Sequence, residues 1–215
     1  MDRSQVAIII PAFNEESTIA EVVALVKGQG VVIVVNDAST DNTKEIAAKA
    51  GAILVNHFQN LGYDSALNSG FKKASELQLD VAITFDADGQ HDEHLIENYV
   101  ALIDQGFEVV VGARDRFQRF SERLFSIVSN WKWGIVDPLC GMKAYRMSIF
   151  KQLGHFDTYG SIGTELAIYA AHRSLKIAQQ PIKIKERKDT PRFGGGFRSN
   201  IIILRALWLG CRRYW

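Results

Sequence analysis

Short runs made up almost wholly of apolar residues recur along the first half of the chain, and a polar stretch follows each of them. The runs at residues 6–10, 31–35, 52–55 and 81–85 have the pattern of strands buried on both faces of a sheet. Between the first two runs, apolar residues recur at helical spacing at Ile19, Val22, Val23 and Val26. Alternating strands and helices predict an α/β fold, with a mostly parallel, twisted, Rossmann-like sheet and helices on both faces.

Turn residues and local composition predict where several strands and helices begin or end. Pro11 is expected to end the first strand, with Asn14 as a turn or cap residue before the next helix. Later strands are expected at residues 108–112 and 181–184, and Glu165 stands at the start of a further helix. The C-terminus is amphipathic, so we expect one domain over residues 1–198 and a terminal helix over residues 199–215.

Acidic residues follow the fourth apolar run, at the sheet edge where ligands bind in open α/β folds. Asp86 and Asp88 are separated only by Ala87, and on an extended backbone they share one side. Gly89 allows a tight turn that brings the amide oxygen of Gln90 to the same point. These oxygen ligands suit Mg²⁺ or Mn²⁺, which keep coordination places for substrate phosphates. The alternative is an acidic turn that binds no metal.

Composition and charge narrow the function classes. Hydrophobic residues make up 47% of the 215 residues, which is enough for a sizeable core, and no stretch approaches the length of a spanning helix. The formal net charge of +1 gives no argument for nucleic acid, and we expect none as a partner. Two distant cysteines and the lack of a signal-peptide pattern favour the cytoplasm. Neither a dinucleotide-binding fingerprint nor a P-loop occurs.

Four segments together carry a resemblance to a known family: PAFNEE at 11–16, VVNDAST at 34–40, NLGYDSALNSG at 60–70 and FDADGQHD at 85–92. In this order and spacing they resemble the family 2 glycosyltransferases of the GT-A fold. A later segment, DPLCGMKAYR at 137–146, is similar to the polyprenyl-phosphate branch, the dolichyl-phosphate mannose synthase-like enzymes.

The resemblance implies that a sugar moves, with inversion, from a UDP- or GDP-sugar to an acceptor, with Mg²⁺ or Mn²⁺ as cofactor. Asp37 would hold the base and Asp86 would touch the ribose or the sugar, while Asp88 and Gln90 would ligate the metal. A cation on the diphosphate neutralises the leaving group without proton transfer. The nucleoside would be lined by residues that follow the first strand, namely Pro11, Ala12, Asn14 and Glu15.

Basic residues indicate the phosphate contacts. We expect Arg114 near the donor phosphates, and the resemblance implies that Arg123 contacts an acceptor phosphate. Arg187 or Arg192 would add a contact from a glycine-containing stretch that departs from the family's usual segment. The alternative for Arg114 is a solvated loop arginine.

Two amphipathic segments suggest that the acceptor is bound at a membrane surface. Residues 114–133 interleave arginines with aromatic residues, a pattern typical of a segment on an anionic membrane surface. Arg198, Arg205 and Arg212 would share one face of the terminal helix. We therefore expect a polyprenyl phosphate acceptor and peripheral contact with the inner face of the membrane. Helices that pack on the core, a homo-oligomer or a membrane partner subunit are the alternatives.

Glu165 separates two acceptor classes. A sugar hydroxyl must lose its proton during attack, so Glu165 would be the general base if the acceptor were a saccharide in cell-surface glycan synthesis. A phosphate acceptor is already an anion, and Glu165 could then be a first-turn acid favoured by the helix dipole.

Two other classes of protein are disfavoured by the sequence. A sugar-1-phosphate nucleotidyltransferase would need a glycine-rich basic loop in place of PAFNEE. A non-catalytic binder would be expected to lose the candidate metal ligands, which are present here.

Overall fold

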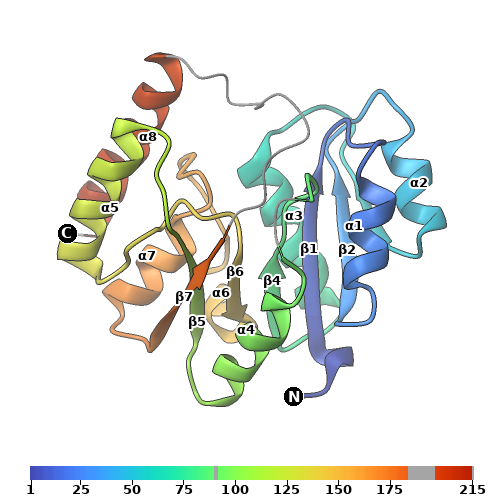
Figure 1. Ribbon diagram of the computed structural model, residues 1–215, viewed down its shortest axis with the longest axis horizontal. Coiled ribbons are helices and arrows are strands. Elements are labelled where there is room, and N and C mark those ends of the chain that lie inside the picture. The colour runs from blue at the N-terminus through green and yellow to red at the C-terminus, as the bar shows by residue number, and fades with distance from the viewer. Residues whose placement is uncertain (90–91, 184–196, 215) are drawn as a thin grey trace.

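The computed structural model describes residues 1–89, 92–183 and 197–214 and shows an α/β fold built on one sheet (Figure 1). The strands are β1 Val6–Ala12, β2 Val31–Asn36, β3 Ile53–Asn56, β4 Val81–Thr84, β5 Val109–Arg114, β6 Lys143–Arg146 and β7 Ile177–Ile182. They lie in the order β3-β2-β1-β4-β6-β5-β7. The predicted fold class is confirmed, and the sheet is mostly parallel, as expected.

One strand runs against the others. β6 is antiparallel to both β4 and β5, while the remaining neighbours are parallel. Lys143, the first residue of β6, pairs with Thr84 at the carboxyl end of β4 and with Val111 in the middle of β5. The chain therefore enters β6 from the carboxyl edge of the sheet, and this brings residues 137–143 to the edge where ligands bind.

β1 is the central strand of the parallel half, and all of its residues are buried. Ile8 and Ile10 contribute to the core on one face of the sheet and Ile9 to the core on the other. The prediction that Pro11 ends this strand is wrong, because Pro11 pairs with Val35. The carbonyl of Ile9 accepts from the backbone amide of the residue that follows β4. Pro11 lies two residues further along β1 and faces the same neighbouring strand, but β4 has already ended at this level. Its missing N–H therefore costs no ladder bond.

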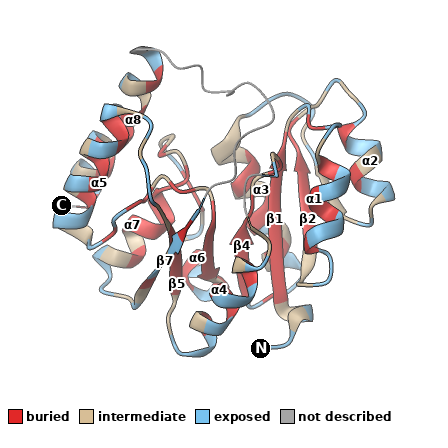
Figure 2. Cartoon of the chain, in the orientation of Figure 1, coloured by how far each residue is buried: buried red, intermediate tan, exposed pale blue. Residues whose placement is uncertain are grey.

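Helices cover both faces of the sheet (Figure 2). Apolar residues of α1 Ile19–Val26, α2 Thr43–Lys49 and α4 Leu95–Asp104 share one core cluster. Those of α3 Tyr63–Glu76, α6 Met147–Leu153 and α7 Glu165–His172 share the other. α3 lies very close to the sheet, because a Cβ on Gly70 would come within 2.3 Å of the Ile9 side chain. The absence of a side chain at Gly70 thus permits the close packing of α3 on β1.

The remaining two helices form a layer of their own. α5 Phe120–Trp133 and α8 Phe197–Arg213 lie side by side in Figure 1 and pack on α7 through a third apolar cluster. They run parallel, because Ser121 donates to Asn200 near their N-terminal ends and Trp133 donates to the Tyr214 carbonyl near their C-terminal ends. α8 begins two residues before the predicted start of the terminal helix. Among the described residues, no helix has the length and apolar character to cross a membrane.

Other element ends differ from the predictions. β5 extends to Arg114, so this arginine ends a strand instead of following one. β7 begins at Ile177, four residues before the predicted start. The first part of this edge strand was not recognised because it mixes buried and exposed residues and contains two glutamines. Asn14 has a φ of 54° and is a turn residue, whereas Thr18 occupies the N-cap of α1. Glu165 is the first residue of α7, as predicted.

Candidate functional site

The loops after β1 and β2 are tied together at the carboxyl edge of the sheet. The amide of Asp37 donates to the carbonyl of Ala12 at 2.9 Å. The Asn14 amide donates to Ser39 Oγ at 3.0 Å, and Asn14 Oδ1 accepts from the Thr40 amide at 2.8 Å. These bonds join residues about 25 positions apart in the sequence, so the left-handed backbone of Asn14 is fixed by tertiary contacts.

The structure places the predicted nucleoside-lining residues at this edge with different exposures. Asn14 is exposed, whereas Pro11, Ala12 and Glu15 are buried. The Glu15 amide donates to Thr43 Oγ1 at 2.7 Å, and its carboxylate accepts from Thr18. Glu15 therefore helps to hold the first loop in place, and its role at a nucleoside stays a prediction.

Asp37 is buried and lies at the centre of a polar cluster. Its Oδ1 accepts from the Leu61 amide at 2.8 Å and from His57 Nδ1 at 2.7 Å, and its Oδ2 accepts from the Gly62 amide at 2.8 Å. His57 Nε2 in turn lies 2.8 Å from Ser69 Oγ in α3. The sequence pointed to Asp37 but not to His57, because nothing in the local pattern around residue 57 shows which carboxylate it meets.

Asp86 and Asp88 follow β4 at the same edge, and both are partly exposed. Tyr63 donates to Asp86 Oδ1 at 3.4 Å. A Cβ on Gly141 would lie 2.1 Å from Asp86 Oδ2, so the carboxylate occupies space that only glycine leaves open. Two partly exposed carboxylates at the end of a strand are the kind of oxygen ligands that a hard divalent cation prefers, and this pair could hold Mg²⁺ or Mn²⁺. Gln90, the third predicted ligand, lies outside the described residues.

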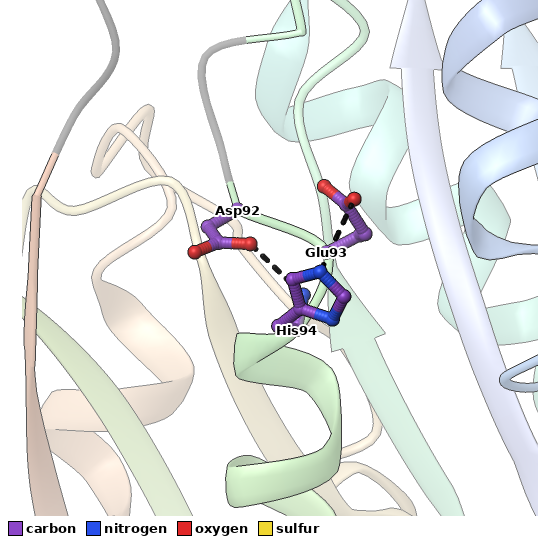
Figure 3. Close-up of side chains that lie close together, drawn as sticks. All are labelled: Asp92, Glu93 and His94. Atoms are coloured by element: carbon purple, nitrogen blue, oxygen red, sulfur yellow. Dashed lines mark hydrogen bonds and ion pairs between the residues drawn. The ribbon is translucent and has the colours of Figure 1, made fainter.

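A second set of possible metal ligands begins two residues further on. Asp92, Glu93 and His94 offer ligand atoms that lie within 4.8 Å of one another just before α4 (Figure 3). The His94 amide donates to Asp92 Oδ1 at 3.1 Å, and its Nε2 lies 3.8 Å from Glu93 Oε1. Acids before a helix are also favoured by its dipole, so the cluster has a structural reason that needs no ion.

Buried charges lie behind the acidic strand end. Arg114 makes a bidentate pair with Asp137, with Nε 2.6 Å from Oδ2 and Nη2 2.9 Å from Oδ1. The alternative of a solvated loop arginine is therefore wrong, and a role for Arg114 at the donor phosphates stays a prediction. Lys143 is buried and donates to the Gly163 carbonyl at 3.0 Å. Burial lowers the pKa of Lys143, and the nearby Asp137 and Asp86 carboxylates offset part of this decrease.

Two carboxylates, Asp157 and Asp64, hold the loop that leads into α7. Asp157 accepts from the amides of residues 159–161, and Asp64 accepts from the amides of residues 162 and 163. Ile162 has a φ of 59°, which is rare for a β-branched residue, so the loop is held in a strained conformation. Burial and the nearby Asp157 raise the pKa of Asp64 to about 6. A cavity of about 270 Å³ lies between this loop and the start of α3.

Glu165 is wholly buried and receives donors from several elements. It accepts from the Thr158 amide at 2.7 Å and from Tyr214 Oη at 3.0 Å, and it lies 3.2 Å from His155 Nε2 and 3.4 Å from Arg213 Nε. The carboxylate thus ties the end of α8 to the start of α7. The sequence placed Glu165 at a helix start, but its partners near the C-terminus could not be read from local pattern.

The predicted phosphate-binding arginines are only partly described. Arg123 is exposed on the first turn of α5, which has Arg119 at its N-cap position. Arg187 and Arg192 lie outside the described residues. The roles of all three at phosphates stay predictions.

Known proteins with related sequences and folds agree with this arrangement. Residues 7–154 match the family described as Glycosyl transferase family 2. The chain is 30% identical over 214 residues to the UDP-N-acetylglucosamine–dolichyl-phosphate N-acetylglucosaminyltransferase of Methanococcus voltae, covering 82% of this chain and 84% of the relative. It is also 30% identical over 209 residues to the dolichyl-phosphate hexose transferase of Haloferax volcanii, covering 88% of each chain.

The fold is shared with a solved glycosyltransferase. Glucosyl-3-phosphoglycerate synthase from Mycobacterium tuberculosis, crystallised with Mn²⁺ and UDP-glucose, superimposes with a TM-score of 0.76 at 22% identity. The match covers 98% of this chain and 79% of that one. The sheet, the acidic strand end and the family match together establish that this chain belongs to glycosyl transferase family 2 and is a glycosyltransferase of the GT-A fold.

Proposed function

We propose that the enzyme transfers a sugar, with inversion, from a UDP- or GDP-sugar to a polyprenyl phosphate at a membrane surface. The observation that carries the proposal is the outward face of α5 and α8, which combines exposed apolar residues with arginines. The relatives named for dolichyl phosphate support the same acceptor class. A saccharide acceptor is the second candidate, favoured only by the acidic residue at the start of α7.

The acidic residues after β4 are the part of the site that would bind the nucleotide-sugar donor. Asp86 and Asp88, with Gln90 as a further ligand, would hold Mg²⁺ or Mn²⁺. When bound, the cation would neutralise the diphosphate leaving group, which otherwise departs poorly. Asp37 would bind the base at the neighbouring strand end, remote from the reacting bond. Tyr63 would help to orient the Asp86 carboxylate through its hydroxyl.

The position of Glu165 favours a phosphate acceptor. A general base must come within hydrogen-bond reach of the proton that it removes. No part of Glu165 is exposed, and its oxygens are already engaged by Thr158, Tyr214 and Arg213. A polyprenyl phosphate attacks through an oxygen that is ionised at neutral pH, so it needs positive charge and orientation but no strong base. We assign Arg123 to that phosphate, and Arg187 or Arg192 could add a second contact.

The outward face of α5 and α8 has the composition of a surface that binds anionic lipid. Its exposed apolar residues include Trp131, whose exposed fraction is 77%, and Trp208, at 58%. The other apolar members are Phe120, Ile127, Ile201 and Leu204, and the exposed arginines of the two helices are Arg123, Arg198, Arg205, Arg212 and Arg213.

Acidic residues are almost absent from these two helices. α8 contains none, and the single acid of α5, Glu122, is buried and paired with Arg119 and Arg114. Of the exposed arginines, Arg213 also pairs with the buried Glu165; otherwise the two helices present cationic and apolar groups with no exposed carboxylate of their own. Such a face would bind anionic headgroups and insert its aromatic residues at the interface.

The decisive experiment measures transfer to a short-chain polyprenyl phosphate and to a panel of free sugars. We expect transfer only to the lipid phosphate, and Arg123→Ala should remove most of it. Arg173→Ala, which alters an arginine beyond the end of α7, is the matched control and should keep the rate. Transfer to a free sugar with none to the lipid would contradict the proposal.

A vesicle experiment tests the membrane face by itself. We expect the protein to sediment with vesicles that contain anionic lipid, and the double substitution Trp131→Ala, Trp208→Ala to reduce this binding at least about tenfold, since each buried aromatic contributes on the order of a kcal/mol or more. Equal binding of both proteins would refute this assignment of the surface.

A further inference from the structure

We propose that Asp37 and His57 select a donor base that presents a single imide N–H, as uracil and thymine do, and reject guanine. This inference rests on the proposed function, because it takes Asp37 as the residue that meets the base. It goes further by choosing between the donor classes that the sequence left open, and it gives His57 a role in specificity.

The Asp37 carboxylate has little acceptor capacity left for a ligand. An ionised carboxylate offers two oxygens with about four lone-pair sites in total. Oδ1 already accepts from the Leu61 amide and from His57 Nδ1, at 2.8 and 2.7 Å. Oδ2 accepts from the Gly62 amide at 2.8 Å. One site, on Oδ2, is therefore left for a ligand, and 5% of the side-chain surface remains exposed.

His57 is held as a donor toward this carboxylate. Because Asp37 can only accept, the Nδ1 atom that lies 2.7 Å from its Oδ1 must carry a proton. On its other side, Nε2 is 2.8 Å from Ser69 Oγ, a hydroxyl that can donate or accept. The ring is thus oriented from both ends, and only 8% of its side-chain surface is exposed. The second lone pair of Oδ1 stays occupied as long as His57 is present.

The two backbone donors are less easily displaced. Leu61 and Gly62 directly precede α3, and Gly62 is its N-cap, with a φ of 86°. Asp37 thus accepts from the amides of the two residues that lead into the helix. A ligand that displaced either amide would leave a partly buried N–H unpaired at a helix start. His57 is therefore the partner that decides how many donors a base can bring.

The bases differ in the donors on the edge that would face Asp37. Uracil and thymine have one N3–H between two carbonyl oxygens, which matches one free acceptor site. Guanine has N1–H beside an exocyclic amino group, a pair that needs both oxygens of a carboxylate. Cytosine has an unprotonated N3 and adenine an unprotonated N1, so each would place a lone pair against the carboxylate. A site that leaves a polar group of the wrong ligand unpaired discriminates strongly.

The first test compares the binding of UDP, dTDP, CDP and GDP by isothermal titration with Mn²⁺. We expect UDP or dTDP to bind at least about tenfold more tightly than GDP, because guanine would leave one buried donor without an acceptor. CDP should be weaker than UDP by a similar or larger factor. Binding of GDP or CDP as tight as that of UDP would overturn the inference.

The second test changes His57 and reads the ratio of the GDP and UDP dissociation constants. His57→Leu removes the Nδ1–H donor and frees a lone pair of Oδ1, so the ratio should fall at least about fivefold toward equal binding. His57→Asn is the matched control, because an asparagine Nδ2–H can donate to Oδ1 and should keep the ratio. A ratio that is the same in wild type and in His57→Leu would overturn the assignment of His57.

These outcomes separate the inference from the proposed function. Tight UDP binding without transfer to a polyprenyl phosphate would refute the acceptor proposal and leave the base selection intact. Tight GDP binding together with transfer to the lipid would do the opposite. A protein that binds none of the nucleotides would refute both. Because each variant is compared with itself on two ligands, a general loss of stability cannot imitate a change in the ratio.

Discussion

Glu165→Gln offers the sharpest distinction between a structural acid and a catalytic base. The substitution keeps the size of the side chain but replaces one carboxylate oxygen by an NH₂ group and removes the charge. Oε2 accepts from the Thr158 amide, while Oε1 lies near Tyr214 Oη, His155 and Arg213. Whichever oxygen is replaced, the new NH₂ group faces at least one existing donor. The variant therefore loses at least one hydrogen bond and gains a donor–donor contact.

The size of the effect can be worked from these partners. Hydrogen bonds to a charged acceptor contribute about 1.5–3 kcal/mol each, and a donor left unpaired in a buried site costs about 1–3 kcal/mol. The side chain of Arg213 is 44% exposed, so its pair with Glu165 is screened and adds less than about 1 kcal/mol. We expect the free energy of unfolding to fall by roughly 2–4 kcal/mol, which lowers Tm by about 10 °C in a chain of this length.

Urea unfolding and initial transfer rates, both measured at a temperature where the variant is folded, test this reasoning. The variant should be less stable yet keep most of kcat with a polyprenyl phosphate acceptor. Tyr214→Phe is the matched control, because it removes only one donor to the carboxylate, costs about 1.5–3 kcal/mol and introduces no donor–donor contact. A Glu165→Gln protein with unchanged stability and no transfer would refute the structural role and favour the saccharide alternative.

Three further predictions concern the acidic strand end and the loop before α7. Asp88→Asn should lower turnover at least ~100-fold with little loss of stability, because a metal contact can supply several kcal/mol; full activity in excess EDTA would contradict it. Gly141→Ala should weaken Mn²⁺ binding in a titration, since its Cβ would lie 2.1 Å from Asp86 Oδ2; unchanged affinity would show that the carboxylate can move. The pKa of Asp64 is raised to about 6 in the folded state from its ordinary value of 3.8, so protonation favours folding. The contribution of protonated Asp64 to the free energy of unfolding, about 3 kcal/mol, should therefore be lost as the pH rises from 4 to 7. The free energy of unfolding of Asp64→Asn, measured with urea, should lack this dependence on pH.

Local patterns in the sequence were enough to predict the parallel half of the sheet and the position of the site. The strands that became β1, β2 and β4 are buried on both faces, so they read as continuous apolar runs. Polar residues directly after those runs had to lie at the carboxyl edge, because parallel strands end on the same side. Asp37, Asp86 and Asp88 were identified in this way, and the helix start at Glu165 followed from its neighbours.

Tertiary structure alone decided which of these groups are paired with one another. Arg114 meets Asp137, His57 meets Asp37, and Glu165 meets Tyr214 across 49 positions of sequence. Strand and helix periodicities describe only the near neighbours of a residue, whereas a salt bridge or a hydrogen bond depends on how distant elements pack. The antiparallel entry of β6 is of the same kind, because direction in a sheet is set by the route of the chain. The sequence could thus show which residues gather at the edge, but not which carboxylates remain free to act there.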